Sequence, residues 1–186
     1  MKLIIGVTGA SGAIYAKLLF QKIKSLSSQI EECCVIFSEN AKTVWRYELG
    51  NEDYEDIPFK IYEPNDFFAP FASGSANFDT MIICPCTMGT LGRIVSGISN
   101  DLMTRSADVI LKERRKLILL TREMPLNFIH LENMKNITLA GGIICPASPT
   151  FYSKPKNISE LCETVIDRLI SLTGLKTDSF SWGGEK

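Results

Sequence analysis

The chain has 186 residues, of which 45% are hydrophobic and 22% are charged, and its formal net charge is −1. This length and composition suit a globular chain that buries a sizeable core without disulfide or metal support. The near-balanced charge offers no basic face for a nucleic-acid backbone. No apolar stretch approaches the roughly 20 residues that span a bilayer, so no membrane span is expected.

The cysteines do not suggest a disulfide framework or a zinc site. Met1 leads directly into an apolar run rather than an export signal, so a cytoplasmic location and reduced thiols are expected. Cys84 and Cys86 are one residue apart rather than two, and the single histidine, His130, is expected to be packed on an apolar helix. No metal is therefore expected, and most cysteines should be small buried hydrophobes. The six are Cys33, Cys34, Cys84, Cys86, Cys145 and Cys162.

The first half of the chain alternates apolar runs with helical patterns. Residues 2–7 (KLIIGV) are typical of a buried parallel strand, and residues 13–26 repeat apolar side chains at helical spacing. A second strand is expected at residues 32–37 (ECCVIF), followed by a helix over residues 39–50. The polar, proline-bearing stretch that follows is expected to contain a short strand at residues 60–62.

The second half continues the alternation. The expected elements are a core strand at residues 81–85, a helix from Thr87 or Met88 that closes over 94–99, a helix over 100–111, a core strand at 116–121, a helical pattern over 125–136, and a strand at 143–146. The last helix, residues 159–173, is expected to be capped by Ser159 and to end at Gly174. Residues 1–175 should form one domain, followed by a tail at 176–186. This alternation predicts an α/β fold, a doubly wound Rossmann-like parallel sheet with helices on both faces.

A glycine-rich turn, Gly9-Ala10-Ser11-Gly12, follows the first expected strand and precedes the first helix. Free backbone N–H groups and the positive end of a helix dipole at such a turn favour a phosphate. Ser11 adds a hydroxyl group. The same glycines are also compatible with a turn that needs them only for its backbone conformation, so the motif takes its meaning from its surroundings.

Hydroxyl-bearing residues follow the next two core strands. Ser38 comes after the second strand, and Thr87-Met88-Gly89-Thr90 comes after the third. Because the carboxyl ends of parallel strands meet at one edge of the sheet, these residues are expected beside the glycine-rich turn and a shared ligand. Thr87 and Thr90 are equally compatible with simple capping of a helix.

Charged groups follow the fourth core strand and recur late in the chain. Arg122 can bind a phosphate through two hydrogen bonds, and Glu123 beside it can relay a proton. An exposed ion pair is the alternative interpretation. Tyr152 and Arg168 add a phenol and a further cation, whereas the run KERR at residues 112–115 is expected to be a solvated helix end.

Three segments resemble the UbiX/Pad1 family of flavin prenyltransferases. They are GVTGASGAIYAKLL, CPCTMGTLGRIVSGISNDLMTRSADVILKERRKLILLTREMPL and PASPTFYSKP. The likeness covers nearly the whole chain. In that family, an open α/β domain binds reduced FMN and dimethylallyl phosphate and joins the prenyl group to flavin N5 and C6. The prenylated FMN is supplied to a UbiD-type decarboxylase.

The resemblance also implies residue roles. It makes Glu123 the proton-transfer group, with Ser11 as a second catalytic residue, and no metal is expected because no acidic magnesium motif is present. Some groups are expected to come from neighbouring subunits of a homododecamer, in which case Lys112 need not be solvated. FMN is placed on Gly9, Ala10, Ser11, Ser38, Thr87, Met88, Gly89, Thr90 and Arg122. Dimethylallyl phosphate is placed near Arg105, Lys112, Arg122, Tyr152 and Arg168.

The chain departs from the family at one loop. Many relatives carry Phe or Trp directly after the segment that corresponds to Ser73-Gly74-Ser75, whereas this chain has Ala76. If an aromatic side chain at this place packs on the prenyl group, this chain either uses Phe78 after a shift of the loop or handles the donor differently.

Two other functions remain open. An FMN-dependent decarboxylase of the cysteine-decarboxylase type shares the expected fold, but it is expected to carry an early histidine and a PASANT-like motif, and this sequence has neither. A non-catalytic flavin-binding delivery protein needs no second phosphate site. Arg122, Glu123, Tyr152 and Arg168 therefore favour catalysis.

Overall fold

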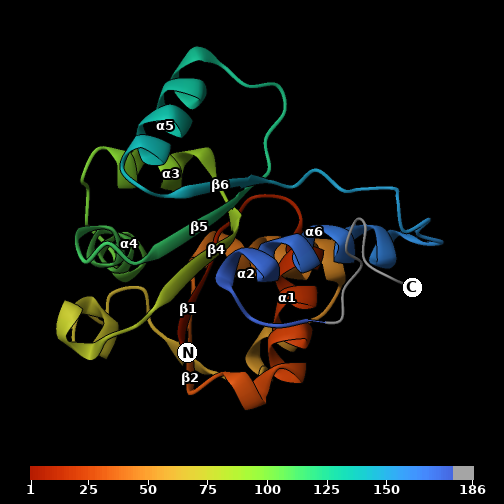
Figure 1. Cartoon of the computed structure of the whole chain (residues 1–186), viewed down its shortest axis with the longest axis horizontal. Coiled ribbons are helices and arrows are strands. Elements are labelled where there is room, and N and C mark those ends of the chain that lie inside the picture. The colour runs from red at the N-terminus through yellow and green to blue at the C-terminus, as the bar shows by residue number, and fades with distance from the viewer. Residues whose placement is uncertain (178–186) are drawn as a thin grey trace.

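A six-stranded parallel sheet forms the centre of the computed structural model, which describes residues 1–177 (Figure 1). The strand order β3-β2-β1-β4-β5-β6 is that of a doubly wound Rossmann-like fold, so the predicted fold class is confirmed. The strands are β1 (Lys2–Val7), β2 (Glu32–Phe37), β3 (Lys60–Tyr62), β4 (Thr80–Cys86), β5 (Lys116–Thr121) and β6 (Ile143–Pro146).

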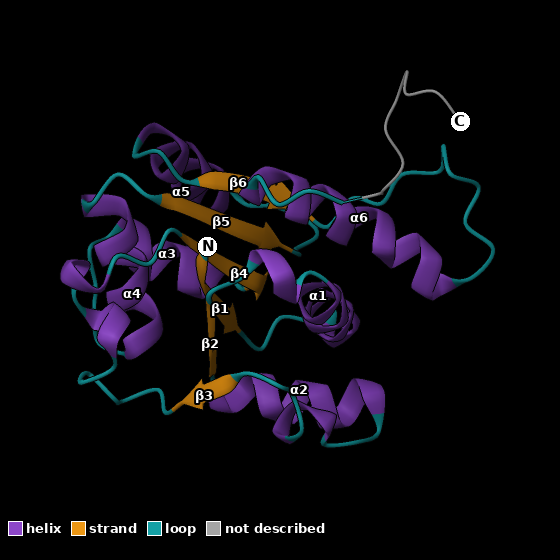
Figure 2. Cartoon of the chain, turned by 60° about the horizontal axis from the view of Figure 1, so that its bottom comes forward, coloured by secondary structure: helices purple, strands orange, loops and turns teal. Residues whose placement is uncertain are grey.

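Helices cover both faces of the sheet (Figures 1 and 2). On one face α1 packs against α2 and α6, and on the other α3 packs against α4 and α5. The helices are α1 (Ala13–Ser25), α2 (Glu39–Leu49), α3 (Met88–Val95), α4 (Leu102–Lys112), α5 (Phe128–Leu139) and α6 (Ile158–Thr173). No helix within residues 1–177 is long and apolar enough to cross a bilayer.

The strands supply two hydrophobic cores because successive side chains point to opposite faces of a sheet. Leu3 and Ile5 of β1 belong to the core under α1, α2 and α6, whereas Ile4 belongs to the core under α3, α4 and α5. All three side chains are fully buried. Burial on both faces explains why the strands read as continuous apolar runs rather than alternating ones.

Thr8 joins the two central strands at the point where the winding of the sheet reverses. Its hydroxyl donates to the carbonyl oxygen of Pro85 at 2.6 Å and accepts from the backbone N–H of Thr87 at 2.9 Å. Thr8 is 3% exposed, so these bonds are shielded from water. Because β1 leads to α1 on one face and β4 leads to α3 on the other, the two loops diverge here and leave a crevice.

Most predicted elements are confirmed, but three helix starts are wrong. The helix predicted over residues 100–111 begins two residues later, at Leu102. The helix predicted over residues 125–136 is capped by Asn127, whose Oδ1 accepts from the N–H of His130 at 2.8 Å, and it begins and ends three residues later than expected. The final helix is capped by Asn157 rather than Ser159. Its end at Gly174, with φ 93°, is confirmed. Of the predicted tail, residues 178–186 lie outside the described residues.

We predict that Thr8→Val destabilises the fold by about 1–3 kcal/mol, because the shape is kept but a buried N–H and a buried carbonyl each lose a partner. Urea unfolding at neutral pH measures this change. Thr43→Val is the matched control, since the Thr43 hydroxyl is exposed and only donates within α2 to Glu39. Equal stabilities for the two variants would contradict a structural role for the Thr8 bridge.

Candidate active site

The glycine-rich turn after β1 is shaped by its neighbours. A Cβ atom at Gly9 would come within 2.6 Å of the Asn40 Cβ, and one at Gly12 within 2.8 Å of the Tyr15 ring. Gly12 also has φ 113°, a conformation that favours glycine. Both glycines are therefore required by the fold, which brings the turn close to the start of α2.

The side chain of Glu48, a residue of α2, lies at the N-terminal end of α1. Its carboxylate accepts hydrogen bonds from the N–H groups of Gly12 and Ala13 at 2.9 and 2.8 Å. Burial opposes ionisation, but the Ser11 hydroxyl, these two amides and the charge of Arg122 together hold the pKa of Glu48 below its usual value. A carboxylate thus sits where the sequence predicted an anion, and it comes from the last turn of α2.

Glu48 was not among the site residues predicted from the sequence. It lies at the exposed end of an ordinary amphipathic helix, and only the packing of α2 against α1 brings it to the turn. A carboxylate in the last turn of α2, where its charge is unfavourable to the helix dipole, is the one sequence signal that marks this residue.

Arg122 lies near the glycine-rich turn, as predicted. Its charge acts on both Glu48 and Tyr15, so it faces the N-terminus of α1. The Nε of Arg122 is buried and has no hydrogen-bond partner among the described residues. A buried donor without an acceptor is costly, so this nitrogen points to a ligand that carries oxygen atoms.

Glu123 is exposed to solvent at the end of the same segment. Its Oε1 accepts from the N–H of Met124 at 3.1 Å, which turns the carboxylate back toward its own backbone. Glu123 therefore does not form the exposed ion pair with Arg122 that was the alternative interpretation.

The hydroxyl turn, residues 87–90, lies across the crevice from the glycine-rich turn. Thr87 caps α3, and its Oγ1 accepts from the N–H of Thr90 at 3.1 Å. The Thr87 hydroxyl donates to Thr90 Oγ1 at 2.9 Å. Ser38 likewise caps α2 by accepting from the Ala41 N–H at 3.1 Å, which leaves its hydroxyl hydrogen for another acceptor.

Gly89 shows that the turn is open toward a ligand. A Cβ atom at Gly89 would meet nothing nearer than the Thr87 Oγ1 at 4.0 Å, and its φ is not positive. Unlike Gly9 and Gly12, it is not required by the neighbouring protein atoms. A glycine that leaves free space above two hydroxyl groups suits close approach of a flat ring.

Tyr152 and Arg168 share a groove of about 940 Å³ along the outer side of α6. The groove runs between α6 and the 150–155 segment, which the N–H of Thr150 ties to the Thr164 hydroxyl at 3.1 Å. The Arg168 guanidinium donates to the Ser171 hydroxyl at 3.3 Å. The structure thus brings this predicted pair together on a solvent-exposed surface.

Lys112 and Arg105 lie elsewhere on α4. Lys112 forms an ion pair with Glu113 shortly before β5 begins, so it lies at the amino edge of the sheet, opposite the crevice. Arg105 donates from Nε to the Ala72 carbonyl at 3.1 Å and pairs with Asp108 at 2.9 Å. Within one chain, Lys112 therefore cannot reach the site of Arg122.

Two predictions about nearby residues need correction. The run at residues 112–115 is not a purely solvated helix end, because Arg115 donates to the Gly74 carbonyl at 2.9 Å and to Asn77 Oδ1 at 3.0 Å. Phe78 is 2% exposed and packs edge-on against Phe71 at 5.4 Å. It is a core residue and is not available to contact a prenyl group.

The thiols behave as packed hydrophobes. Cys84 and Cys86 are fully buried, and burial raises the pKa of the Cys86 thiol to about 12. Burial likewise raises the pKa of Cys33 to about 12. Among residues 1–177, no three His, Cys, Asp or Glu side chains gather in a way that could hold a metal ion.

The fold and the crevice define a Rossmann-like protein of the nucleotide-binding class, with anion-binding groups at the switch point of the sheet. The family model described as Flavoprotein matches residues 1–170. A flavin prenyltransferase UbiX from Methanocaldococcus jannaschii is 42% identical, and the alignment covers 98% of this chain and 99% of that protein. The chain belongs to the UbiX/Pad1 family of flavin prenyltransferases, and it is an enzyme of that class.

Two solved structures extend the similarity to the fold. The crystal structure of AnUbiX (PadA1) in complex with FMN and dimethylallyl pyrophosphate has a TM-score of 0.93 at 37% identity, covering 100% of this chain and 98% of that one. A dodecameric FMN-dependent UbiX-like decarboxylase from Escherichia coli O157:H7 also gives 0.93 at 37% identity, covering 99% and 100%. The predicted family, fold class and enzyme class are confirmed.

We predict that Glu48→Gln removes a pH-dependent contribution to stability. The pKa of Glu48 is lowered in the folded chain, so its carboxylate stabilises the fold above the ordinary value of 4.5, and this contribution is lost as the pH falls through the lower folded value. The stability difference between wild type and variant should therefore be largest near pH 7 and shrink between about pH 5 and pH 3.

Denaturant unfolding at several pH values measures this difference. Glu55→Gln, which removes an exposed carboxylate away from the turn, is the control. A Glu48→Gln difference that stays constant across the pH range would show that Glu48 does not bind the amides as a carboxylate.

Proposed function

We propose that the chain transfers a dimethylallyl group from dimethylallyl phosphate to N5 and C6 of reduced FMN. The product, prenylated FMN, is supplied to a UbiD-type decarboxylase. The observation that carries this proposal is the buried Nε of Arg122, which has no hydrogen-bond partner among residues 1–177 and follows β5 at the carboxyl edge of the sheet, where the glycine-rich turn and the hydroxyl turn also lie. FMN offers a ring and a phosphate, and both fit these groups.

FMN is held by both turns. Met88 and Gly89 at the start of α3, together with Thr87 and Thr90, form the surface against the ring, and the free space at Gly89 allows close approach. Gly9, Ala10, Ser11 and Ser38 line the opposite side of the crevice. When bound, reduced FMN would supply the electron-rich N5 and C6 atoms, which form bonds to two different carbon atoms of the dimethylallyl group.

Arg122 acts between the flavin and the prenyl donor. Its guanidinium has one orphan donor toward the crevice, and Glu48 restrains it electrostatically from the other side. A cation held in this way stabilises negative charge on a departing phosphate as the allylic C–O bond breaks. A monophosphate donor fits a site whose charges come from arginine and lysine side chains rather than from a metal.

Glu123 and Ser11 handle protons. Glu123 is adjacent to Arg122, and its second carboxylate oxygen has no hydrogen-bond partner among residues 1–177, so it can accept the C6 proton as the ring regains aromaticity. Ser11 donates to Glu48, which fixes the serine hydroxyl beside the donor phosphate. The departing phosphate is an alternative base.

The donor site is completed by neighbouring copies of the chain in a homododecamer. Tyr152 and Arg168 share an exposed groove, Arg105 is bound to Ala72, and Lys112 lies at the opposite edge of the sheet from Arg122. These groups can act on one dimethylallyl phosphate only if different subunits contribute them. The Escherichia coli relative is dodecameric, which supports this assembly.

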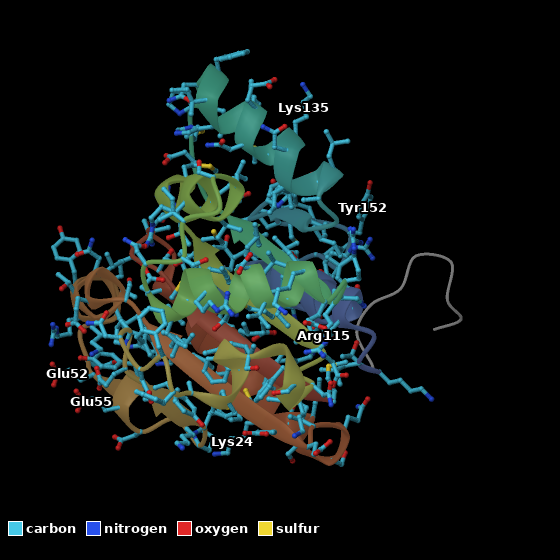
Figure 3. All side chains as sticks on the ribbon, turned by 90° about the vertical axis from the view of Figure 1, so that its left-hand side faces the viewer. Lys24, Glu52, Glu55, Arg115, Lys135 and Tyr152 are labelled. Atoms are coloured by element: carbon cyan, nitrogen blue, oxygen red, sulfur yellow. The ribbon has the colours of Figure 1, made fainter. Side chains whose placement is uncertain are left out.

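The contact surface between subunits is formed by the exposed side of α5 and by the segment that precedes this helix. Among the twelve residues of α5, only Ile137 is buried, and Figure 3 shows side chains such as Lys135 projecting from α5 away from the body of the molecule. The surface is rich in apolar side chains next to Glu123, as expected for an interface between subunits. Its large exposed apolar residues are Met124, Leu126, Phe128, Ile129, Leu131 and Leu139.

The alternatives are less well supported. A decarboxylase of the cysteine-decarboxylase type would use an early histidine, but the single histidine of this chain, His130, lies on α5, where its Nδ1 accepts from the N–H of Asn127 at 3.4 Å. A delivery protein would not need the Tyr152–Arg168 groove. We also propose that residues 1–175 form the one FMN-binding domain and that the enzyme is cytoplasmic, in keeping with six free thiols.

Anaerobic incubation of the purified protein with reduced FMN and dimethylallyl monophosphate tests the reaction. Flavin extracted afterwards should gain the mass of one dimethylallyl group, and dimethylallyl diphosphate in a parallel reaction should be a poorer donor. A flavin of unchanged mass, recovered from protein that demonstrably holds FMN, would overturn the proposed reaction in favour of the delivery protein.

We predict that Glu123→Gln slows prenylation by about 100-fold while FMN affinity stays unchanged, because the variant keeps the shape of the side chain but cannot accept a proton. Single-turnover formation of the product under anaerobic conditions measures the rate. Glu55→Gln, which removes an exposed carboxylate away from α5 and from the crevice, serves as the control. A wild-type rate for Glu123→Gln would show that Glu123 does not accept the C6 proton and that the departing phosphate is the base.

A further inference from the structure

An arginine lies directly behind the hydroxyl turn. Arg93, in the last turn of α3, donates from Nη1 to Asn100 Oδ1 at 2.9 Å and forms an ion pair with Asp101 Oδ2. Its Nη2 lies 3.4 Å from Thr90 Oγ1. The guanidinium thus connects the turn that faces the crevice with the start of α4.

Thr104 holds the Asp101 carboxylate in place independently of Arg93. Its Oδ1 accepts from the N–H and the hydroxyl of Thr104 at 2.7 and 2.8 Å, in a capping box at the start of α4. Burial opposes its ionisation, but the Thr104 bonds and Arg93 hold the pKa of Asp101 below its usual value. The carboxylate is therefore charged and anchored, and it holds the Arg93 fork in one orientation.

The donor hydrogen of the Thr90 hydroxyl is the one part of this group that makes no hydrogen bond within residues 1–177. A hydroxyl has two acceptor positions and one donor hydrogen. Thr90 Oγ1 accepts from the Thr87 hydroxyl at 2.9 Å and from Arg93 at 3.4 Å, so both acceptor positions are filled. Thr90 is 5% exposed, and within residues 1–177 its hydroxyl donates to nothing. A buried donor that is oriented but unused indicates a ligand acceptor.

We propose that Arg93 is a positioning residue for the flavin. It directs the Thr90 O–H toward an acceptor atom of FMN, and its charge behind that hydroxyl strengthens the hydrogen bond most when the ring is reduced and electron-rich. The Arg93–Asp101 pair thereby favours the reduced over the oxidised flavin. This inference rests on the proposed contact between FMN and residues 87–90.

Arg93→Met tests the role, because methionine keeps most of the apolar stem and removes the charge. We expect the affinity for reduced FMN to fall by about fivefold and that for oxidised FMN by about twofold or less, so the potential of bound FMN should become more negative. Fluorescence titration and equilibration with a reference dye measure both quantities. Arg93→Lys, which keeps the charge, should restore part of the preference.

Thr90→Val separates a positioning role from a structural one. If Arg93 acts through the Thr90 hydroxyl, the double variant Arg93→Met/Thr90→Val should match Thr90→Val alone in its preference for reduced FMN. Arg46→Met is the control, because Arg46 forms an exposed ion pair with Glu52 at 3.0 Å on α2. An Arg93→Met variant that unfolds more easily but keeps the wild-type ratio of affinities would refute the inference.

Two further variants distinguish an error in the proposed FMN site from an error in the role of Arg93. Gly89→Leu places a side chain in the space above the turn, where a Cβ atom meets nothing nearer than 4.0 Å, so it should abolish FMN binding if the ring lies there. If Gly89→Leu and Thr90→Val both leave FMN affinity unchanged, the proposed site itself is wrong. If they weaken FMN binding while Arg93→Met leaves the preference for reduced FMN unchanged, only the positioning role is wrong.

Discussion

The Thr8 hydroxyl makes the contact on which the crevice depends. A doubly wound sheet sends the helices after its two central strands to opposite faces, so the loops that carry the functional groups diverge. Thr8 holds the end of β1 to Pro85 in β4 and to Thr87 directly after β4, and it does so in a buried position. The glycine-rich turn and the hydroxyl turn therefore keep a fixed separation, which is what a rigid, flat ring needs from both sides.

The balance of charge in the crevice follows from this geometry. The N-terminus of α1 offers amide donors, and the fold meets them with the Glu48 carboxylate rather than leaving them to solvent. A phosphate bound at the same amides would face repulsion from Glu48, so the phosphate of a ligand is better matched to Arg122, whose Nε has no partner in the described chain. Glu48 also interacts with the Ser11 hydroxyl and with the charge of Arg122.

The sequence predicted the parts of the site that depend on local pattern and missed those that depend on packing. Strands such as β1 and β5 were bounded correctly because they are buried on both faces, and Thr87 was identified because a cap follows directly from its position before a helix. The cap of α6 was misassigned because asparagine and serine compete for such positions, and Asn157 has the required extended backbone. Glu48 and Arg93 act through side chains far away in sequence or across a loop, and no periodicity marks such contacts.

Several of the groups proposed to act on the prenyl donor are exposed to solvent or far apart within a single chain. Glu123 and Tyr152 are exposed, yet the proton transfer proposed for Glu123 and the phosphate binding proposed for Tyr152 are favoured where water is excluded. Lys112 lies at the far edge of the sheet from Arg122, so no closure of loops within one subunit can bring them together. In the proposed homododecamer, neighbouring copies would bury the apolar surface around α5 and so provide both a dry environment and the missing cations. The subunit contacts would then be part of the active site, because they change the solvation of Glu123 without changing its position in the chain.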